Sequence, residues 1–254
     1  MPAVFVHGVP ATHRFWNPVL DRMSRKDVIA VALPGLDSSA KFAIDGTKES
    51  YIEWLIGLLQ SLGEAVDLVG HDWGCLLALR VASLRPDLVR TLAVGGASIS
   101  PDRQWHAIAR TWQTPGAGER YFRELNRVDL IARWVDDGLP ADVATEFASH
   151  IDAAMGAAIL KLYRSALTVF AEWHPDIARI QAPSTVFYGT HDKVCTRADA
   201  EKLARDIGAS ALAEIQGGHW FPLQQPAAFA QSLEEHWARC AGLPPTSRAP
   251  AARP

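Results

Sequence analysis

The sequence predicts an α/β fold, in which a mostly parallel sheet is flanked by helices and carries an inserted helical cap. The first observation is that short apolar runs alternate with amphipathic stretches, as in parallel sheets with helices on both faces. The second is an interruption of this rhythm between Val94 and Ser184. This segment of roughly ninety residues reads as mostly helical and is too long for an ordinary connection.

The predicted strands are short runs rich in β-branched residues, near Val4–Val6, Val28–Ala32, Val66–Val69, Thr91–Val94, Ser184–Tyr188 and Ala211–Ile215. The predicted helices are amphipathic runs, and Pro86 marks the end of one of them. They cover Phe15–Met23, Glu49–Leu62, Cys75–Leu84, Arg197–Ile207 and Pro226–Ala238.

These elements divide the chain into a core and an insertion. Residues 1–99 and 176–241 form the predicted α/β core, and residues 100–175 form a helical cap. We expect the cap to cover the carboxyl edge of the sheet, where ligands bind in open α/β folds. Residues 242–254, rich in Pro, Ala and Arg, are predicted to be disordered.

Composition excludes several classes of function. A chain of 254 residues, 48% of them hydrophobic, can bury a substantial core. A net charge of -3 without a basic cluster argues against nucleic acid as a partner. No apolar run reaches the length of about 18 residues that a membrane span needs. The absence of a basic leader and the three widely spaced cysteines favour the cytoplasm, and a homodimer remains open.

The segment from Val69 to Cys75 has the pattern of a nucleophile elbow. A short apolar run precedes it, a helical run follows it, and glycines lie two residues on either side of Asp72. Serine is the usual residue at the centre of this turn. A carboxylate attacking acyl carbon gives a high-energy anhydride, whereas at sp³ carbon it gives an ordinary alkyl ester. Asp72 therefore predicts displacement at carbon, with an epoxide oxygen or a halide as leaving group.

Two residues near this turn are candidate oxyanion donors. The turn that follows the first predicted strand contains Gly8, which allows the backbone N–H of Val9 to point at the site. The N–H of Trp73, next to the nucleophile, supplies the second donor. Cys75 follows in the first helical turn, where a lowered thiol pKa is one reading and a small buried core residue is the favoured one.

Two further loops supply a base and its partner. The loop after the penultimate predicted strand carries Asp192, where a carboxylate can fix the tautomer of a histidine. A glycine pair after the last predicted strand presents His219, as suits a general base. Asp176, just after the cap, is the less favoured alternative to Asp192 as the acidic partner.

These motifs resemble those of the epoxide hydrolase and haloalkane dehalogenase group of α/β-hydrolases, over roughly Val4 to Ala238. Gly-His-Asp-Trp-Gly around Asp72 and Gly-His-Trp around His219 carry the resemblance. It implies an α/β-hydrolase fold with Asp72 as nucleophile, His219 as water-activating base and Asp192 as its partner. No metal or organic cofactor is implied.

The cap resembles that of epoxide hydrolases. The run from Trp112 to Glu119 is similar to their Phe-Gln-x-Pro-Gly-x-x-Glu pattern, and the surroundings of Tyr163 resemble their second ring-opening tyrosine. Tyr163 would then hydrogen-bond the epoxide oxygen and donate its proton as the alkoxide forms. The first tyrosine of these caps would fall near Ile108, where the chain has none, and His106 is the candidate substitute.

Four tryptophans are expected to line an apolar substrate pocket, although plain core packing is the alternative: Trp73, Trp105, Trp112 and Trp220. The leading functional hypothesis is hydrolysis of a small apolar epoxide to a vicinal diol through a hydroxyalkyl ester on Asp72. Haloalkane dehalogenation is the alternative, and haloacetate is disfavoured because Trp73 and Leu76 replace the arginines that would hold its carboxylate. A second alternative is a ligand-binding homologue without turnover.

Overall fold

The computed structural model describes residues 1–37 and 44–241, and its centre is a six-stranded, fully parallel sheet. The strands follow the order β2-β1-β3-β4-β5-β6 across the sheet. Their bounds are β1 Ala3–Val6, β2 Val28–Val31, β3 Val66–His71, β4 Val89–Gly95, β5 Ser184–Gly189 and β6 Ala211–Ile215. Each predicted strand is confirmed, and the predicted tail 242–254 lies outside the described residues.

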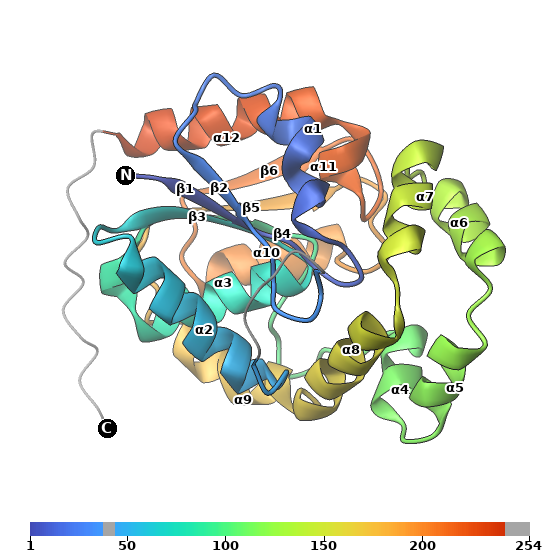
Figure 1. Ribbon diagram of the computed structural model, residues 1–254. Coiled ribbons are helices and arrows are strands. Elements are labelled where there is room, and N and C mark those ends of the chain that lie inside the picture. The colour runs from blue at the N-terminus through green and yellow to red at the C-terminus, as the bar shows by residue number, and fades with distance from the viewer. Residues whose placement is uncertain (38–43, 242–254) are drawn as a thin grey trace.

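Helices cover both faces of this sheet (Figure 1). One layer contains α1 Asn17–Leu20, α11 Phe221–Gln224 and α12 Pro226–Cys240. The other contains α2 Lys48–Ser61, α3 Trp73–Leu84, α9 Val169–Ile177 and α10 Arg197–Asp206. A further group gathers beyond the carboxyl ends of the strands: α4 Ala107–Gln113, α5 Ala117–Arg123, α6 Arg127–Asp136, α7 Ala141–His150 and α8 Ala153–Ser165. The predicted α/β-hydrolase fold is therefore confirmed.

One predicted helix differs from the structure. Instead of a continuous helix over Phe15–Met23, the chain makes a 3₁₀ turn at His13–Trp16 and then the single turn of α1. The cause is Pro18, which has no N–H to continue a helix begun upstream and is well suited to the first turn of a new one. Beyond α1 the chain continues only as turns up to Met23.

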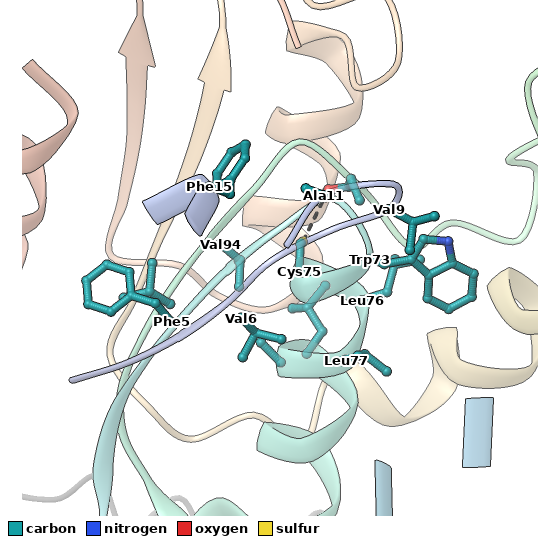
Figure 2. Close-up of a cluster of buried hydrophobic side chains, with 14 of the residues drawn as sticks. Phe5, Val6, Val9, Ala11, Phe15, Trp73, Cys75, Leu76, Leu77 and Val94 are labelled. Carbon is teal, nitrogen blue, oxygen red and sulfur yellow. Dashed lines mark hydrogen bonds between the residues drawn. The ribbon is translucent and has the colours of Figure 1, made fainter. Parts of the chain in front are cut away.

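The core beneath the catalytic end of the sheet is apolar and tightly packed. Figure 2 shows Cys75 among these side chains, together with Val6 and Leu76. The Cys75 thiol is fully buried, and its Sγ donates to the carbonyl oxygen of Ala97 at 3.5 Å. Burial raises the pKa of this thiol, and the nearby carboxylate of Asp72 raises it further. Cys75 is thus the core residue that the sequence favoured.

The opposite end of β3 holds a buried ion cluster. Asp67, near the start of the strand, is fully buried. Its carboxylate accepts hydrogen bonds from Arg25 Nη1 at 2.5 Å, from Thr91 Oγ1 at 2.7 Å, and from Arg90. Burying a carboxylate is costly unless it is paired and hydrogen-bonded, and these three donors meet that requirement.

Two structural features bear on membranes and metals. Within residues 1–37 and 44–241, no single helix is both long and apolar enough to cross a membrane. The helices α8 and α9 pass that test only as a pair, and they meet at an angle of 68°. In the same part of the chain, no group of three or more His, Cys, Asp or Glu residues is arranged to hold a metal ion.

Candidate active site

The turn between β3 and α3 places Asp72 in an unusual backbone conformation. Its φ of 56° and ψ of -123° make it the one positive-φ residue other than glycine among the described residues. The sharp turn brings backbones together so closely that a Cβ on Gly70 would lie 2.3 Å from the oxygen of Gly74, and one on Gly74 would lie 2.0 Å from the oxygen of Val6. Only glycine fits at these two positions, as the elbow pattern requires.

The predicted oxyanion donors lie at this turn. The Val9 N–H donates to Oδ1 of Asp72 at 2.8 Å, so the first predicted donor contacts the predicted nucleophile. A Cβ on Gly8 would approach Asp72 to 2.4 Å, which explains why the neighbouring position is glycine. Trp73 is the first residue of α3, so its N–H belongs to the helical turn whose amides have no partner within the helix.

The predicted base and its partner meet at the same edge of the sheet. His219 Nδ1–H donates to Oδ2 of Asp192 at 3.1 Å, while Nε2 of His219 lies 3.6 Å from Oδ2 of Asp72. Oδ1 of Asp192 accepts the N–H groups of Val194 and Cys195 at 2.7 and 3.0 Å. The carboxylate is therefore fixed by backbone donors on one oxygen and orients the imidazole with the other.

The electrostatics of this group favour the ionised forms. Burial opposes the charge on His219, but the carboxylates of Asp192 and Asp72 outweigh burial and raise its pKa to about 10. Burial also opposes the charge on Asp72, yet interaction with His219 holds the pKa of that carboxyl below its usual value. The same balance lowers the pKa of Asp192. The free protein therefore holds an imidazolium between two carboxylates.

The alternative acid, Asp176, lies elsewhere. It is on α9, where Oδ2 accepts from Arg80 Nη1 at 2.6 Å and Oδ1 pairs with Arg179 at 3.2 Å. These contacts hold α9 against α3. The prediction that Asp176 is an alternative partner of the histidine is wrong, because its carboxylate is occupied by two guanidinium groups and Asp192 is the carboxylate bonded to His219.

Tyr163 reaches the site from α8. It is 2% exposed and lines the same cavity as Asp72. Its ring packs edge-on against Trp73 at 5.3 Å and Trp112 at 4.9 Å, and it lies 5.2 Å from the ring of Trp105. Burial, together with the Asp72 charge, raises the pKa of the phenol well above its ordinary value. Tyr163 is therefore a neutral hydroxyl held in a fixed orientation.

His106 is the N-cap residue of α4 and lies two residues before Ile108, the position expected for the first cap tyrosine. Its Nδ1 accepts the N–H of Ala109 at 3.2 Å, so this ring nitrogen caps the helix. His106 and Ile108 both line the cavity. The capping bond fixes the ring and occupies Nδ1, which leaves Nε2 as the nitrogen that can serve a substrate.

A cavity of about 560 Å³ lies over Asp72. The core contributes Asp72 and His219 to its wall, together with apolar residues such as Val9 and Trp220, and the cap contributes further apolar surface. Trp112 and Trp220 line it as predicted. Trp73 and Trp105 instead line a second hollow of about 390 Å³, which shares Asp72 and Tyr163 with the first. The prediction of four tryptophans in one pocket is therefore wrong for these two, because they stack on each other at 5.7 Å.

The sequence reasoning missed most of the cap wall and four charged residues that line the cavity, two of them acidic (Asp136 and Asp137) and two basic. The missed apolar residues, which come from α5, α6 and the end of α7, are Tyr121, Phe122, Leu130, Trp134 and Ile151. The basic residues are Arg133 and Lys193, and neither side chain forms a hydrogen bond or ion pair within the described part of the chain. The apolar periodicity of α6, with Leu130 and Trp134 four residues apart, was the one available signal.

Comparison with known proteins agrees with this geometry. A family model described as alpha/beta hydrolase family matches residues 3–232. The (E)-2-((N-methylformamido)methylene)succinate hydrolase of Acinetobacter baylyi is 34% identical over 240 residues, which cover 92% of this chain and 89% of that protein. Epoxide hydrolase 2 of Siraitia grosvenorii is 37% identical over 36% of this chain and 31% of its own length.

The solved structures include the haloalkane dehalogenase DbeA from Bradyrhizobium elkani USDA94. It aligns with a TM-score of 0.78 and 24% identity over 94% of this chain and 90% of that chain. An identity this low supports the fold alone. The family model, however, covers most of the sequence, and the Acinetobacter relative matches almost from end to end. The protein is a hydrolase and belongs to the alpha/beta hydrolase family.

Proposed function

We propose that this protein hydrolyses an epoxide to a vicinal diol through an ester on Asp72. The two oxygens of Asp72 have different surroundings, and this difference assigns their roles. Oδ1 accepts the Val9 N–H at 2.8 Å, whereas Oδ2 lies near the imidazole of His219. Oδ2 is then the atom that attacks the ring carbon. Oδ1 becomes the ester carbonyl, already in place to receive the oxyanion in the second step.

The observation that carries this proposal is the buried hydroxyl of Tyr163 in the cavity above Asp72. An epoxide oxygen leaves as an alkoxide, which is far more basic than a phenolate. A neutral phenol therefore donates its proton downhill as the C–O bond breaks. The packing of Tyr163 between Trp73 and Trp112 fixes the direction of this donor before the substrate arrives.

The second step needs a neutral His219. While Asp72 is ionised, the pKa of His219 is raised to about 10 and the imidazole is protonated. Forming the ester removes the negative charge of Asp72, and this favours transfer of the Nε2 proton through solvent to the phenolate that ring opening left at Tyr163. His219 can then take a proton from water as the water attacks the Asp72 carboxyl carbon. When the tetrahedral intermediate collapses, the bond between that carbon and the alkyl oxygen breaks. The alkyl oxygen leaves in the diol with the remaining proton of the attacking water, and Asp72 regains its carboxylate.

Dehalogenation is a second candidate, favoured by a specific observation. The indole N–H groups of Trp73 and Trp112 are buried and have no hydrogen-bond partner among the described residues. Both rings pack on Tyr163, and each belongs to a hollow that is lined by Asp72. A halide needs donors and no proton, and this arrangement suits it too. Val9 adds no side-chain donor, which leaves the phenol better matched to an epoxide oxygen.

The test is product analysis on a matched panel of aryl and alkyl epoxides and haloalkanes, with Asp72→Ala as the control. We expect diol from an epoxide, no halide release, and no product from the variant. Single turnover in H₂¹⁸O, with enzyme in excess, should place the label in Asp72 and not in the first diol formed.

The panel also includes (E)-2-((N-methylformamido)methylene)succinate, the compound named for the Acinetobacter relative. Hydrolysis of this amide with epoxides untouched would overturn the proposal. Halide release without diol would replace it with dehalogenation. Ligands that bind without turnover would identify a binding protein.

A further inference from the structure

We propose that His71 is a positioning residue that holds the loop bearing His219 against the nucleophile turn. His71 is the last residue of β3 and directly precedes Asp72. Its side chain is 2% exposed. Its Nε2 lies 2.9 Å from the backbone carbonyl oxygen of His219, and the two rings are 4.9 Å apart. One side chain thus connects the strand that carries the nucleophile with the residue that activates water.

The surroundings of His71 allow it one position. Its ring stacks on Phe15 at 5.0 Å with an interplanar angle of 21°, and packs edge-on against Phe221 at 5.3 Å. On the remaining side, a Cβ on Gly96 would lie 2.4 Å from Nε2. An imidazole enclosed in this way has little freedom to rotate, so it acts as a rigid spacer between Asp72 and the base.

The hydrogen-bond direction follows from the acceptor. A carbonyl oxygen can only accept, so Nε2 of His71 carries the hydrogen and donates it to His219. Burial, together with the positive charge of His219, lowers the pKa of His71 to about 4. His71 is therefore neutral across the working range, with the hydrogen on Nε2, and it adds no second positive charge beside the imidazolium.

The loop that carries His219 needs such an anchor. Gly217 and Gly218 precede the base, and Gly217 adopts a φ of 138° that favours glycine. The Gly218 N–H donates to Gln224 Oε1 at 2.7 Å, and Asp192 fixes the imidazole through Nδ1. The Gly217 carbonyl oxygen also accepts the His191 N–H at 2.8 Å, so the other backbone hydrogen bonds of this loop lead to α11 and to the loop after β5, and not to the nucleophile turn. Among the described residues, the hydrogen bond from His71 is the one that ties the backbone of His219 to β3.

The inference rests on the proposed function, because it separates two chemical steps. Ester formation uses Asp72 and Tyr163, whereas ester hydrolysis needs His219 at the right distance from the Asp72 carboxyl carbon. Misplacement of a catalytic group by about 1 Å can reduce a rate by roughly a hundredfold. Loss of the His71 hydrogen bond should therefore slow hydrolysis and affect ester formation much less.

The experiment compares His71→Phe, which keeps a flat ring and loses the donor, with His71→Gln, which keeps an N–H donor. Single-turnover quench and intact-protein mass spectrometry follow the appearance and decay of the ester on Asp72. We expect ester decay to slow by about ten- to a hundredfold in His71→Phe, with formation slowed less than about threefold. His71→Gln should recover most of the decay rate.

A matched control is His236→Phe. His236 is also a fully buried histidine, bonded through Nδ1 to Thr185 Oγ1 at 2.9 Å, and it lies outside both hollows. It should leave both steps unchanged. Only folded enzyme forms the ester, so the rate of ester decay does not depend on how much of the variant is unfolded. If His71→Phe yields no folded protein, His71→Leu is used in its place. Equal slowing of both steps, or unchanged decay, overturns the inference.

A substrate-free measurement separates this inference from the proposed function. NMR titration of free enzyme should show that the raised pKa of His219 falls in His71→Phe and is restored in His71→Gln, because a shifted loop carries the imidazole away from Asp72. If the wild-type enzyme forms no ester, the proposed function fails and the titration still decides the role of His71. An unchanged His219 pKa in His71→Phe counts against that role.

Discussion

Asp67 and Asp72 lie five positions apart in the sequence, at opposite ends of the β3 region, and their surroundings differ completely. Asp67 receives two guanidinium groups and a hydroxyl. Asp72 accepts a hydrogen bond from one backbone N–H and lies 3.6 Å from an imidazole, and its own backbone has a strained, positive φ. A carboxylate whose oxygens are fully paired is fixed in place. A carboxylate left partly unpaired in a cavity retains a lone pair for reaction.

The largest effect is expected at the reactive end of this comparison. Asp72→Asn removes the attacking oxygen's charge and should reduce turnover by at least about 10⁴-fold. Steady-state kinetics on the best epoxide of the panel measures this loss. At pH 7, Asp72→Asn should lower the free energy of unfolding by less than Asp67→Asn does. Residual activity within a factor of ten of the wild type would remove Asp72 from the chemistry.

The matched change at the other end should affect stability. Asp67→Asn leaves Arg25 and Arg90 without their shared carboxylate, and breaking such a buried cluster costs about 3 kcal/mol. Urea unfolding at pH 7 measures the loss, while turnover per folded molecule should stay near that of the wild type. A variant as stable as the wild type would mean that the cluster adds no net stability.

Tyr163→Phe tests the cap side of the reactive end. It keeps the aromatic contacts with Trp73 and Trp112 and removes the proton donor, so epoxide opening should slow by about 10²-fold. Rates of ester formation for an epoxide and a haloalkane provide the measurement. An equal loss on both substrates would indicate that the hydroxyl acts as a plain hydrogen-bond donor.

The smallest effect concerns the pH dependence of stability. His219 has a pKa raised from 6.5 to about 10 in the folded protein. Its contribution to stability is therefore complete below pH 6.5 and is lost as the pH rises toward 10. Asp72→Asn removes one carboxylate that raises this pKa, so the decline should become shallower. Unfolding curves between pH 6.5 and 10 check this, and Asp67→Asn should keep the wild-type slope.

The sheet and the catalytic edge could be predicted from sequence because both depend on short-range patterns. Buried β-branched runs specify strands, and the carboxyl ends of parallel strands converge, so Asp72, Asp192 and His219 could be placed together. The elbow pattern also carries its own backbone geometry. The positions of Trp105 and Asp176 could not be predicted from such short-range patterns.

The remaining features depend on tertiary packing. From their apolar character, Trp105 and Trp73 could equally line a pocket or pack against each other. Only the packing of the cap shows that their rings stack. Asp176 follows the cap as a partner carboxylate would, but Arg80 on α3 occupies it. His71 is part of the motif in the sequence, and nothing there indicates a bond to a residue 148 positions later.

The cavity has two kinds of wall, and substitutions have different consequences in each. The sheet edge supplies the proposed nucleophile and base, where a Cβ on Gly8 or Gly74 would collide with neighbouring atoms. Apart from Tyr163, the cap supplies apolar lining residues such as Leu130 and Ile151. Substitutions at these apolar positions can therefore reshape which molecules enter while the proposed reaction stays the same. In this architecture, a change of substrate requires substitutions in one wall, whereas turnover depends on keeping the residues of the other.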